Sequence, residues 1–515
     1  MFLKHRQSTN FRRLFMEAYF MGIDTGTQGV RVAVSNKEGV LLFEEEKKWE
    51  TLFPKKGWAE QNPLDWWDAI SGIFEDALAG LGREQMKKIR AVCVCATSST
   101  VFPVDRDGRP LRNAMMWMDA RSRKEMDAIN ETKHPVLDYC GKETSFEWMI
   151  PKALWLKHHE PEIYGSCYKI VEQLDWINYQ LCGEWSSSIC NTTCKWNYVA
   201  SLGGYQRDFF EQIGFEDYEE KLVMRVDKIG DTVGSIRLEL AEKYGFSEEM
   251  EVVQGGIDAH MAMFGLDVLR PGKLGIIMGT SFVHLCLSDK KPDMPGIWGP
   301  YDSAVLDGMW LLEGGQISAS GLVNWFRKNF HIPEENGNPY AKLLDIPERI
   351  PIGADGLTVL DFFQGNRTPY KDAGAKGVIF GLNIRHTWEH IYRAVLEAVS
   401  YGTYNIICNY EKYGYMVDMI TACGGVTKDG QWMQMISDIT GKPITVNRNS
   451  QAGALGCCVV SAAQGRGYES FQEAAAHMVV PKKVIYPDME KHRDYEPYFQ
   501  KYLDLYRNLK DFMHQ

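Results

Sequence analysis

Two strand–turn–strand segments of the same kind constrain the fold of this chain more than any other feature. In the first, an apolar run beginning at Ala18 leads Asp24 into a tight Gly/Thr turn, and an alternating strand follows up to residue 34. Residues 273–287 repeat this pattern about 250 residues later. Free backbone N–H groups and hydroxyls in such turns can bind a phosphate, although ordinary hairpin turns favour the same residue types. The repeat predicts two domains of like architecture, with a nucleotide in the cleft between them.

The length of the chain also requires more than one domain. A chain of 515 residues is too long for a single hydrophobic core, so two or three domains are expected. Strands alternate with helical patterns throughout, which indicates an α/β protein. Arg270-Pro271-Gly272 interrupts a helical segment. We therefore place an N-terminal domain at residues 18–266 and a C-terminal domain at residues 267–500.

The composition excludes several classes of partner. A net charge of −11 argues against a nucleic-acid partner, which would require a basic surface. No apolar run approaches the roughly 20 residues needed to cross a bilayer. Residues 1–17 mix basic and aromatic side chains but lack the apolar core and cleavage site of a signal peptide. We interpret them as an extension before the fold, with Met16 or Met21 as an alternative start, and expect a soluble cytoplasmic protein.

The twelve cysteines fit a reducing compartment. Cys190 and Cys194 are four residues apart, but no second pair gives the spacing of a zinc site. We therefore interpret the cysteines as small buried core residues. The N-terminal half is rich in tryptophan, which we assign mostly to the core, and a few of these rings are candidates for stacking against a sugar.

Asp258 is the strongest candidate for a catalytic acid or base. Two glycines precede it at the predicted start of a helix, just before the domain junction. Such an acid could accept the proton of an attacking hydroxyl in phosphoryl transfer, although a helix N-cap is the structural alternative. For His260 we favour packing or a local hydrogen bond over a second catalytic base. Gly424 and Gly425 follow a buried strand, where an adenine or a ribose could lie against the backbone. P-loop and dinucleotide-binding spacings are absent from the sequence.

With these motifs the chain resembles the FGGY carbohydrate kinases, members of the superfamily of sugar kinases, actin and heat-shock ATPases. Residues 377–382, followed after seven residues by residues 390–397, match the family's C-terminal signature at every position. Residues 149–156 approximate the N-terminal signature with a shifted lysine. The resemblance covers residues 19–467 and implies two ribonuclease H-like (actin-like ATPase) domains flanking a nucleotide cleft.

The resemblance also implies roles for individual residues. Asp258 corresponds to the catalytic base, and Asp24 and Asp258 are the residues expected near the metal. Phosphate contacts are expected from Thr25, Gly26, Thr27, Arg31, Gly279, Thr280 and Ser281. Nucleotide contacts are expected from Gly321, Asn324, Gly424, Gly425 and Asp429. Substrate contacts are expected from Thr97, Ser98, Ser99, Trp117, Asp119 and Asp258.

The resemblance implies ATP-dependent phosphorylation of a small sugar, with ATP and Mg²⁺ as cofactors. Asp258 would accept the proton late, so its pKa need not be strongly raised. Residues 96–100 carry neither the Arg-Glu pair of glycerol kinases nor the Gln-Met-His run of xylulose kinases. This favours the ribulokinase-like branch and a ketopentose such as ribulose. A xylulose or polyol kinase of the erythritol or glycerol type is the alternative within the family, and an actin- or chaperone-type ATPase switch is the alternative outside it. The sequence leaves open whether the protein forms a homodimer.

Overall fold

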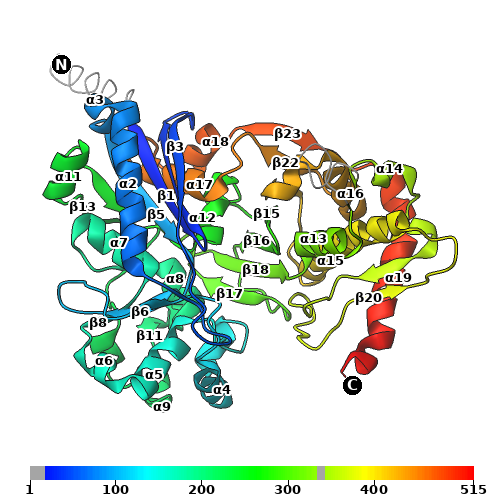
Figure 1. Cartoon of the computed structure of the whole chain (residues 1–515), viewed down its shortest axis with the longest axis horizontal. Helices are drawn as coiled ribbons and strands as arrows, with labels where there is room; N and C mark the ends of the chain where they lie inside the picture. Colours follow the sequence, from blue (N-terminus) through cyan, green and yellow to red (C-terminus); the bar gives the residue numbers. More distant parts are fainter. Residues whose placement is uncertain (1–17, 333–342, 515) are drawn as a thin grey trace. The chain divides into compact units, whose positions relative to one another are not determined.

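The computed structural model describes residues 18–332 and 343–514, which form two compact units (Figure 1). The first unit contains residues 18–269 together with Tyr301–Leu311 and Gln451–Val480. The second contains Arg270–Pro300, Leu312–Ser450 and Pro481–Gln515, apart from the undescribed residues. The sequence-based interpretation of residues 1–17 lies outside the described residues.

A six-stranded sheet forms the centre of the first unit. Its strand order is β13-β14-β5-β1-β2-β3. The bounds are β1 Tyr19–Gly26, β2 Gly29–Asn36, β3 Leu41–Lys48, β5 Ile89–Ala96, β13 Thr232–Ser235 and β14 Glu251–Val253. β1 is antiparallel to β2 and parallel to β5, and β5 is parallel to β14. The predicted first hairpin is therefore confirmed, and its turn lies at one end of a buried strand.

The helices of the first unit cover both faces of this sheet, because alternate residues of a strand point to opposite faces. Met21 and Ile23 of β1 share a hydrophobic core with Trp66 and Phe74 of helix α2. On the opposite face, a Cβ at Gly22 would collide with the carbonyl oxygen of Ala454 in helix α17. The helices flanking the sheet are α2 Pro63–Leu81, α3 Arg83–Met86, α7 Gln173–Cys182, α11 Leu238–Tyr244, α12 Asp258–Gly265, α17 Ala452–Ala462 and α18 Phe471–Met478.

An aromatic-rich region between β3 and β13 adds a second layer to this unit. It contains a four-stranded sheet of order β4-β7-β6-β8. Its larger elements are β4 Glu60–Gln61, β6 Val101–Val104, β7 Ala114–Met115, β8 Lys169–Glu172, α4 Arg123–Glu131, α5 Met149–His159, α6 Pro161–Ser166, α8 Ile189–Lys195, α9 Arg207–Gln212 and α10 Tyr218–Lys221. Trp66, Trp148, Trp155, Trp176 and Trp196 are buried, as expected for core tryptophans.

The second unit repeats the arrangement of the first around a sheet of order β17-β18-β16-β15-β21-β22-β23. The bounds are β15 Lys273–Met278, β16 Phe282–Ser288, β17 Trp298–Asp302, β18 Trp310–Gln316, β21 Met419–Cys423, β22 Ile444–Asn447 and β23 Pro481–Ile485. β15 is antiparallel to β16 and parallel to β21, which is the relation of β1 to β2 and β5. Its helices are α13 Ala319–Asn329, α14 Ile346–Arg349, α15 Trp388–Lys412, α16 Gly430–Thr440 and α19 Met489–Met513, and β19 Thr358–Leu360 pairs with β20 Val378–Phe380.

Two further expectations can be compared with the structure. All twelve cysteines are among the described residues, none forms a disulfide, and all except Cys182 and Cys408 are buried. Among the helices of residues 18–332 and 343–514, none has both the length and the apolar character needed to span a bilayer.

Candidate active site

The first candidate phosphate turn joins β1 to β2, and Asp24 lies just before it. The Asp24 carboxylate is 12% exposed and lies 4.0 Å from the Arg31 guanidinium. The Cys95 thiol on the neighbouring strand β5 donates to Oδ1 of Asp24 at 3.3 Å. Burial raises the pKa of Asp24, although the Cys95 hydrogen bond and the Arg31 charge oppose this shift. Gly26 ends β1 two residues after this acid and pairs with Gly29 across the turn, so the tight turn lies next to a poorly solvated carboxylate.

Two threonines of this turn use their side chains within the protein. Thr25 is fully buried, and its hydroxyl donates to the carbonyl oxygen of Cys95 at 2.7 Å. The Thr27 hydroxyl accepts a hydrogen bond from the indole N–H of Trp117 at 3.2 Å. The Thr25 hydroxyl therefore holds β1 against β5, and the Thr25 carbonyl oxygen accepts a hydrogen bond from the N–H of Thr97 at 3.1 Å, so its predicted phosphate contact stays a prediction. The Thr27 contact brings the phosphate turn and a predicted substrate residue together.

Asp258 is the first residue of α12, and Ile257 occupies the N-cap position. Its Oδ1 accepts a hydrogen bond from the N–H of Ala259 at 2.7 Å. Burial, followed by the charge of Asp24, raises the pKa of Asp258 to about 7. Asp258 is therefore not the N-cap, which was the structural alternative to a catalytic role, and its pKa is raised although the predicted mechanism does not require this. A carboxylate with this pKa is a much better proton acceptor near neutral pH than an exposed aspartate.

The start of α17 also lies beside Asp24, which the sequence did not reveal. A Cβ at Gly453, in the first turn of α17, would lie 2.6 Å from Oδ2 of Asp24. The same helix packs closely on α12, because a Cβ at Gly456 would collide with the carbonyl oxygen of Met261. The small-residue pattern was interpreted as helix packing, which is confirmed, but it also allows a helix N-terminus to approach an acid.

The predicted substrate segment follows β5. Thr97 and Thr100 share a hydrogen bond between their hydroxyls at 2.9 Å, and Ser98 is half-buried beside them. Ser99 is 1% exposed and has a φ of +58°, which non-glycine residues rarely adopt. Its hydroxyl is buried without a hydrogen-bond partner among the described residues. A strained residue with an unsatisfied hydroxyl at this position is typical of a binding site.

Asp119 has a different environment from the one we predicted. It is fully buried, and its carboxylate accepts hydrogen bonds from the N–H of Ala59 and from the side chain of Arg121, both at 2.7 Å. The Arg121 guanidinium in turn lies 3.6 Å from the ring centre of Trp58. Arg121 also donates to the other carboxylate oxygen, Oδ1, at 2.8 Å, so Asp119 anchors the loop that carries Trp117, and its predicted sugar contact stays a prediction.

Lys152 of α5 is the main site-building residue that the sequence did not identify. Its ammonium is fully buried and donates to the carbonyl oxygens of Ser99 at 2.7 Å, Met116 at 2.6 Å and Trp117 at 3.4 Å. Burial lowers the pKa of Lys152 to about 7, although the negative charge of Asp119 opposes this shift. One side chain therefore joins both segments predicted to contact substrate.

The second unit brings several predicted nucleotide residues together around the β15–β16 turn. Gly279 and Thr280 are exposed, and the carbonyl oxygen of Thr280 accepts a hydrogen bond from the N–H of Gly321 at 2.9 Å. Gly424 has a φ of +103°, and a Cβ there would collide with the carbonyl oxygen of Met278. Gly425 is exposed beside it. The two predicted motifs thus lie at the same end of the neighbouring strands β15 and β21. Ser281, just before β16, is half-buried.

Two other predicted nucleotide residues have local partners. Asp429 is the N-cap of α16, and its Oδ1 accepts from the N–H groups of Gln431 at 3.1 Å and Trp432 at 3.0 Å. Asp429 therefore caps α16 through one carboxylate oxygen, burial raises its pKa, and its predicted nucleotide contact stays a prediction. Asn324 is half-buried on α13, where its Oδ1 lies 3.5 Å from the Arg327 guanidinium.

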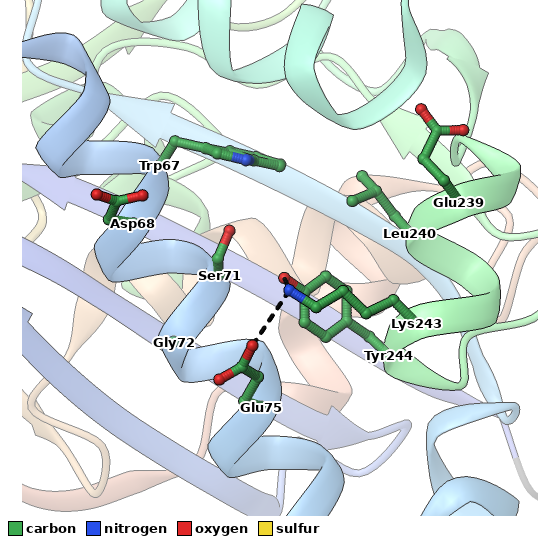
Figure 2. A pocket seen from close by; sticks show the side chains of 9 residues that line it. All are labelled: Trp67, Asp68, Ser71, Gly72, Glu75, Glu239, Leu240, Lys243 and Tyr244. Atoms are coloured by element: carbon green, nitrogen blue, oxygen red, sulfur yellow. Dashed lines mark hydrogen bonds and ion pairs between the residues drawn. The ribbon is translucent and has the colours of Figure 1, made fainter.

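A surface groove elsewhere in the first unit does not match the predicted site. It lies between α2 and α11, and its lining includes Trp67, Glu75 and Lys243 (Figure 2). The Lys243 ammonium pairs with Glu75 at 3.2 Å and donates to the hydroxyl of Tyr244. None of its lining residues is a predicted site residue.

The donor set fits a magnesium site at Asp24 and Asp258. Both acids have raised pKa values because each is buried and, for Asp258, because the other carboxylate is near. A divalent cation would relieve this cost, and carboxylate oxygens are the ligands that Mg²⁺ prefers.

Comparison with known proteins gives a consistent family assignment. Residues 19–265 match the model of the N-terminal domain of the FGGY family of carbohydrate kinases, and residues 274–464 match that of its C-terminal domain. The FGGY carbohydrate kinase domain-containing protein of Homo sapiens is 31% identical, covering 96% of this chain and 98% of its own length.

Two bacterial enzymes and one solved structure extend this comparison. A ribulokinase of Bacillus licheniformis is 29% identical, covering 88% of this chain and 87% of its own. A xylulose kinase of Bacillus subtilis is 28% identical, covering 96% of this chain and 97% of its own. The crystal structure of a xylulose kinase from Brucella ovis has a TM-score of 0.87 and 20% identity, covering 96% of this chain and all of that chain.

Proposed function

The chain belongs to the FGGY family of carbohydrate kinases, and we propose that its substrate is a ketopentose such as ribulose. It is a phosphotransferase that uses ATP and acts on a small carbohydrate, as family membership establishes. The ribulokinase relative and the residue types at 97–100 support the finer assignment. The observation that carries the reaction chemistry is Asp258, a half-buried acid whose pKa is raised to about 7.

We propose that Asp258 acts as the general base. Its carboxylate would accept the proton of the sugar hydroxyl as that oxygen attacks the terminal phosphorus of ATP. The hydrogen bond from Ala259 fixes one carboxylate oxygen and leaves the other for the substrate. Burial keeps water from competing for this oxygen, so the protein spends little energy on reorganisation during transfer.

We further propose that Asp24 holds the metal and that the two hairpin turns bind phosphate. Magnesium, when bound, neutralises the charge of the phosphate oxygens. Arg31, half-buried at 4.0 Å from Asp24, supplies a positive charge at the first turn. At the second turn the Gly279 N–H donates to the carbonyl oxygen of Ser281, so the exposed backbone of Thr280 would supply the N–H donor to phosphate. The adenosine would lie against Gly424 and Gly425, because residues without a side chain present a flat backbone surface.

In this proposal the sugar binds to the N-terminal domain, residues 18–266, and the nucleotide binds to the C-terminal domain, residues 267–500. Trp117 and the segment 97–99 would contact the sugar, since a hydrogen bond ties Trp117 to the phosphate turn at Thr27. The buried, unpaired hydroxyl of Ser99 is the strongest candidate for recognising a sugar hydroxyl. A site that hydrogen-bonds one hydroxyl rejects sugars that lack it.

A xylulose or polyol kinase is the second candidate, supported by the relative from Bacillus subtilis. The ATPase-switch alternative loses its support, because the family shown is one of carbohydrate kinases.

ADP release with ATP and magnesium tests the proposal across D- and L-ribulose, D- and L-xylulose, glycerol, erythritol and ribitol. We expect one ketopentose to give a turnover far above the others. Turnover on a polyol alone would overturn the ketopentose assignment and keep the kinase mechanism. Failure of every sugar, with ATP still bound, would reject the whole substrate panel.

A further inference from the structure

A buried cluster of soft metal ligands lies close to the general base but outside the predicted active site. It consists of Cys190 and Cys194 of α8 and His260 of α12. The two cysteines are four residues apart, so both point from the same face of their helix. His260 lies two residues after Asp258 on the same helix, α12. The two cysteines are fully buried and His260 is 2% exposed.

The distances within this cluster match the edges of a metal tetrahedron. Sγ of Cys190 lies 3.2 Å from Nδ1 of His260, and Sγ of Cys194 lies 4.0 Å from the same atom. All three ligand atoms lie within 4.8 Å of one another. Tetrahedral zinc with ordinary Zn–S and Zn–N bonds requires S···N separations of about 3.6 Å and an S···S separation of about 3.8 Å. Shifts of a few tenths of an ångström would therefore complete the three-ligand geometry.

The backbone at Gly256 packs closely against the Cys190 side chain, which helps to fix the position of the thiol. A Cβ at Gly256 would lie 2.8 Å from Cβ and 3.0 Å from Sγ of Cys190. Gly256 is not among the glycines with positive φ, so its conformation alone does not require glycine. Glycine is favoured there because a Cβ would collide with the Cys190 side chain, so the backbone can approach the sulfur.

We propose that Cys190, Cys194 and His260 bind one zinc ion that fastens α8 to the first turn of α12. On binding, each thiol loses its proton to solvent and forms a Zn–S bond, while the imidazole donates its Nδ1 lone pair. Two thiolates and one neutral imidazole around Zn²⁺ carry no net charge, which suits a buried site. Sulfur and imidazole ligands select zinc, whereas the oxygens of Asp24 and Asp258 select magnesium, so the two sites differ in chemistry.

The sequence missed this site because the third ligand is about 65 residues away from the cysteine pair. Without that ligand, Cys190 and Cys194 were interpreted as core residues. The structure confirms that they are buried and adds His260 at bonding range. The expectation of a local hydrogen bond for His260 fits its position beside Cys190, and zinc would replace that contact with two metal bonds.

Zinc content of the purified full-length chain tests the proposal directly. The protein is incubated with zinc, passed through a desalting column with a weak chelator, and measured by plasma mass spectrometry. We expect one zinc per wild-type chain and none above background for the double variant Cys190→Ser/Cys194→Ser. The matched control is Cys286→Ser/Cys408→Ser in the second unit, which should keep its zinc. Equal zinc in the wild type and the Cys190/Cys194 variant would overturn the proposal.

A second measurement uses the wild-type chain, so its result does not depend on whether a cysteine variant folds. Cobalt is exchanged into the chain, and we expect sulfur-to-cobalt charge-transfer absorption together with the intense visible bands of a tetrahedral site. A spectrum with neither feature would overturn the proposal. An Asp258→Asn variant should lose turnover but keep its zinc and its cobalt spectrum. This separates failure of the zinc site from failure of the proposed kinase mechanism.

Discussion

Replacement of Lys152 by methionine tests how the candidate sugar site is held together. The variant keeps a long side chain in α5 but removes the donors to the carbonyl oxygens of Ser99 and Met116. Each buried acceptor left without a donor costs roughly 1–3 kcal/mol. Because Ser99 belongs to a predicted substrate segment, we expect the KM for the sugar to rise while the KM for ATP stays unchanged.

The sign and size of the pH effect follow from the pKa of Lys152. Burial lowers this pKa from 10.5 to about 7, so the unfolded chain binds a proton between these values that the folded chain does not. Stability of the wild type therefore rises with pH through this window, relative to a variant that has no amine. A difference of one bound proton changes the free energy of unfolding by about 1.4 kcal/mol per pH unit. The wild type therefore gains about 2 kcal/mol of stability relative to the variant between pH 7 and pH 9.

Urea unfolding at pH 6, 7.5 and 9 measures this difference, with Lys124→Met as the matched control on an exposed helix position. We expect the gap between wild type and Lys152→Met to widen as pH rises, and the gap for Lys124→Met to stay constant. A gap for Lys152→Met that is equal at pH 6 and pH 9 would refute the reasoning. An unchanged sugar KM would show that the lysine stabilises the fold without organising the site.

Three further substitutions examine other parts of the molecule. Asp258→Asn should lower kcat by several orders of magnitude and leave ATP affinity, measured by calorimetry, nearly intact; equal losses in both would indicate a structural role. Gly424→Ala should weaken ATP binding, because its Cβ collides with the Met278 carbonyl, whereas Gly165→Ala, with open space around it, should not. Burial raises the pKa of Asp361 from 3.8 to about 6, so the folded chain binds the proton more tightly. The wild type should therefore lose about 2 kcal/mol relative to Asp361→Asn as pH rises from 4 to 6, and parallel unfolding curves across this range would contradict that assignment.

The sequence was sufficient for the architecture, because each hairpin carries its own local signal. Asp24 before a Gly/Thr turn and Gly279 in the repeat both lie where an apolar strand meets small residues, and the structure confirms both hairpins. The role of Gly424 could also be predicted from the sequence, since a glycine after a buried strand indicates that another backbone or a ligand approaches closely. Such features depend on residues within a few positions of one another, and a single sequence contains them.

The sequence could not predict which groups form hydrogen bonds with the polar side chains of the candidate site. Asp119 and Asp429 were predicted as ligand contacts because of their motifs, but their carboxylates bind the protein's own N–H groups. An acid that caps a helix and an acid that binds a substrate cannot be distinguished from a single sequence. They differ only in which donors the fold brings to their oxygens, and for Asp119 one such donor, Ala59, is 60 residues away.

The raised pKa of Asp258 has the same origin, because it depends on groups that only the fold brings together. A late proton transfer places little demand on the base, so the family chemistry alone does not require a perturbed acid. The fold nevertheless buries Asp258 and places the charge of Asp24 near it, although 234 residues separate them in sequence. Two carboxylates that repel each other in a poorly solvated site favour whatever cation reduces their charge. In the proposed mechanism, the arrangement that raises the pKa of Asp258 also favours magnesium at Asp24, so replacing Asp24 should weaken both proton transfer and metal binding.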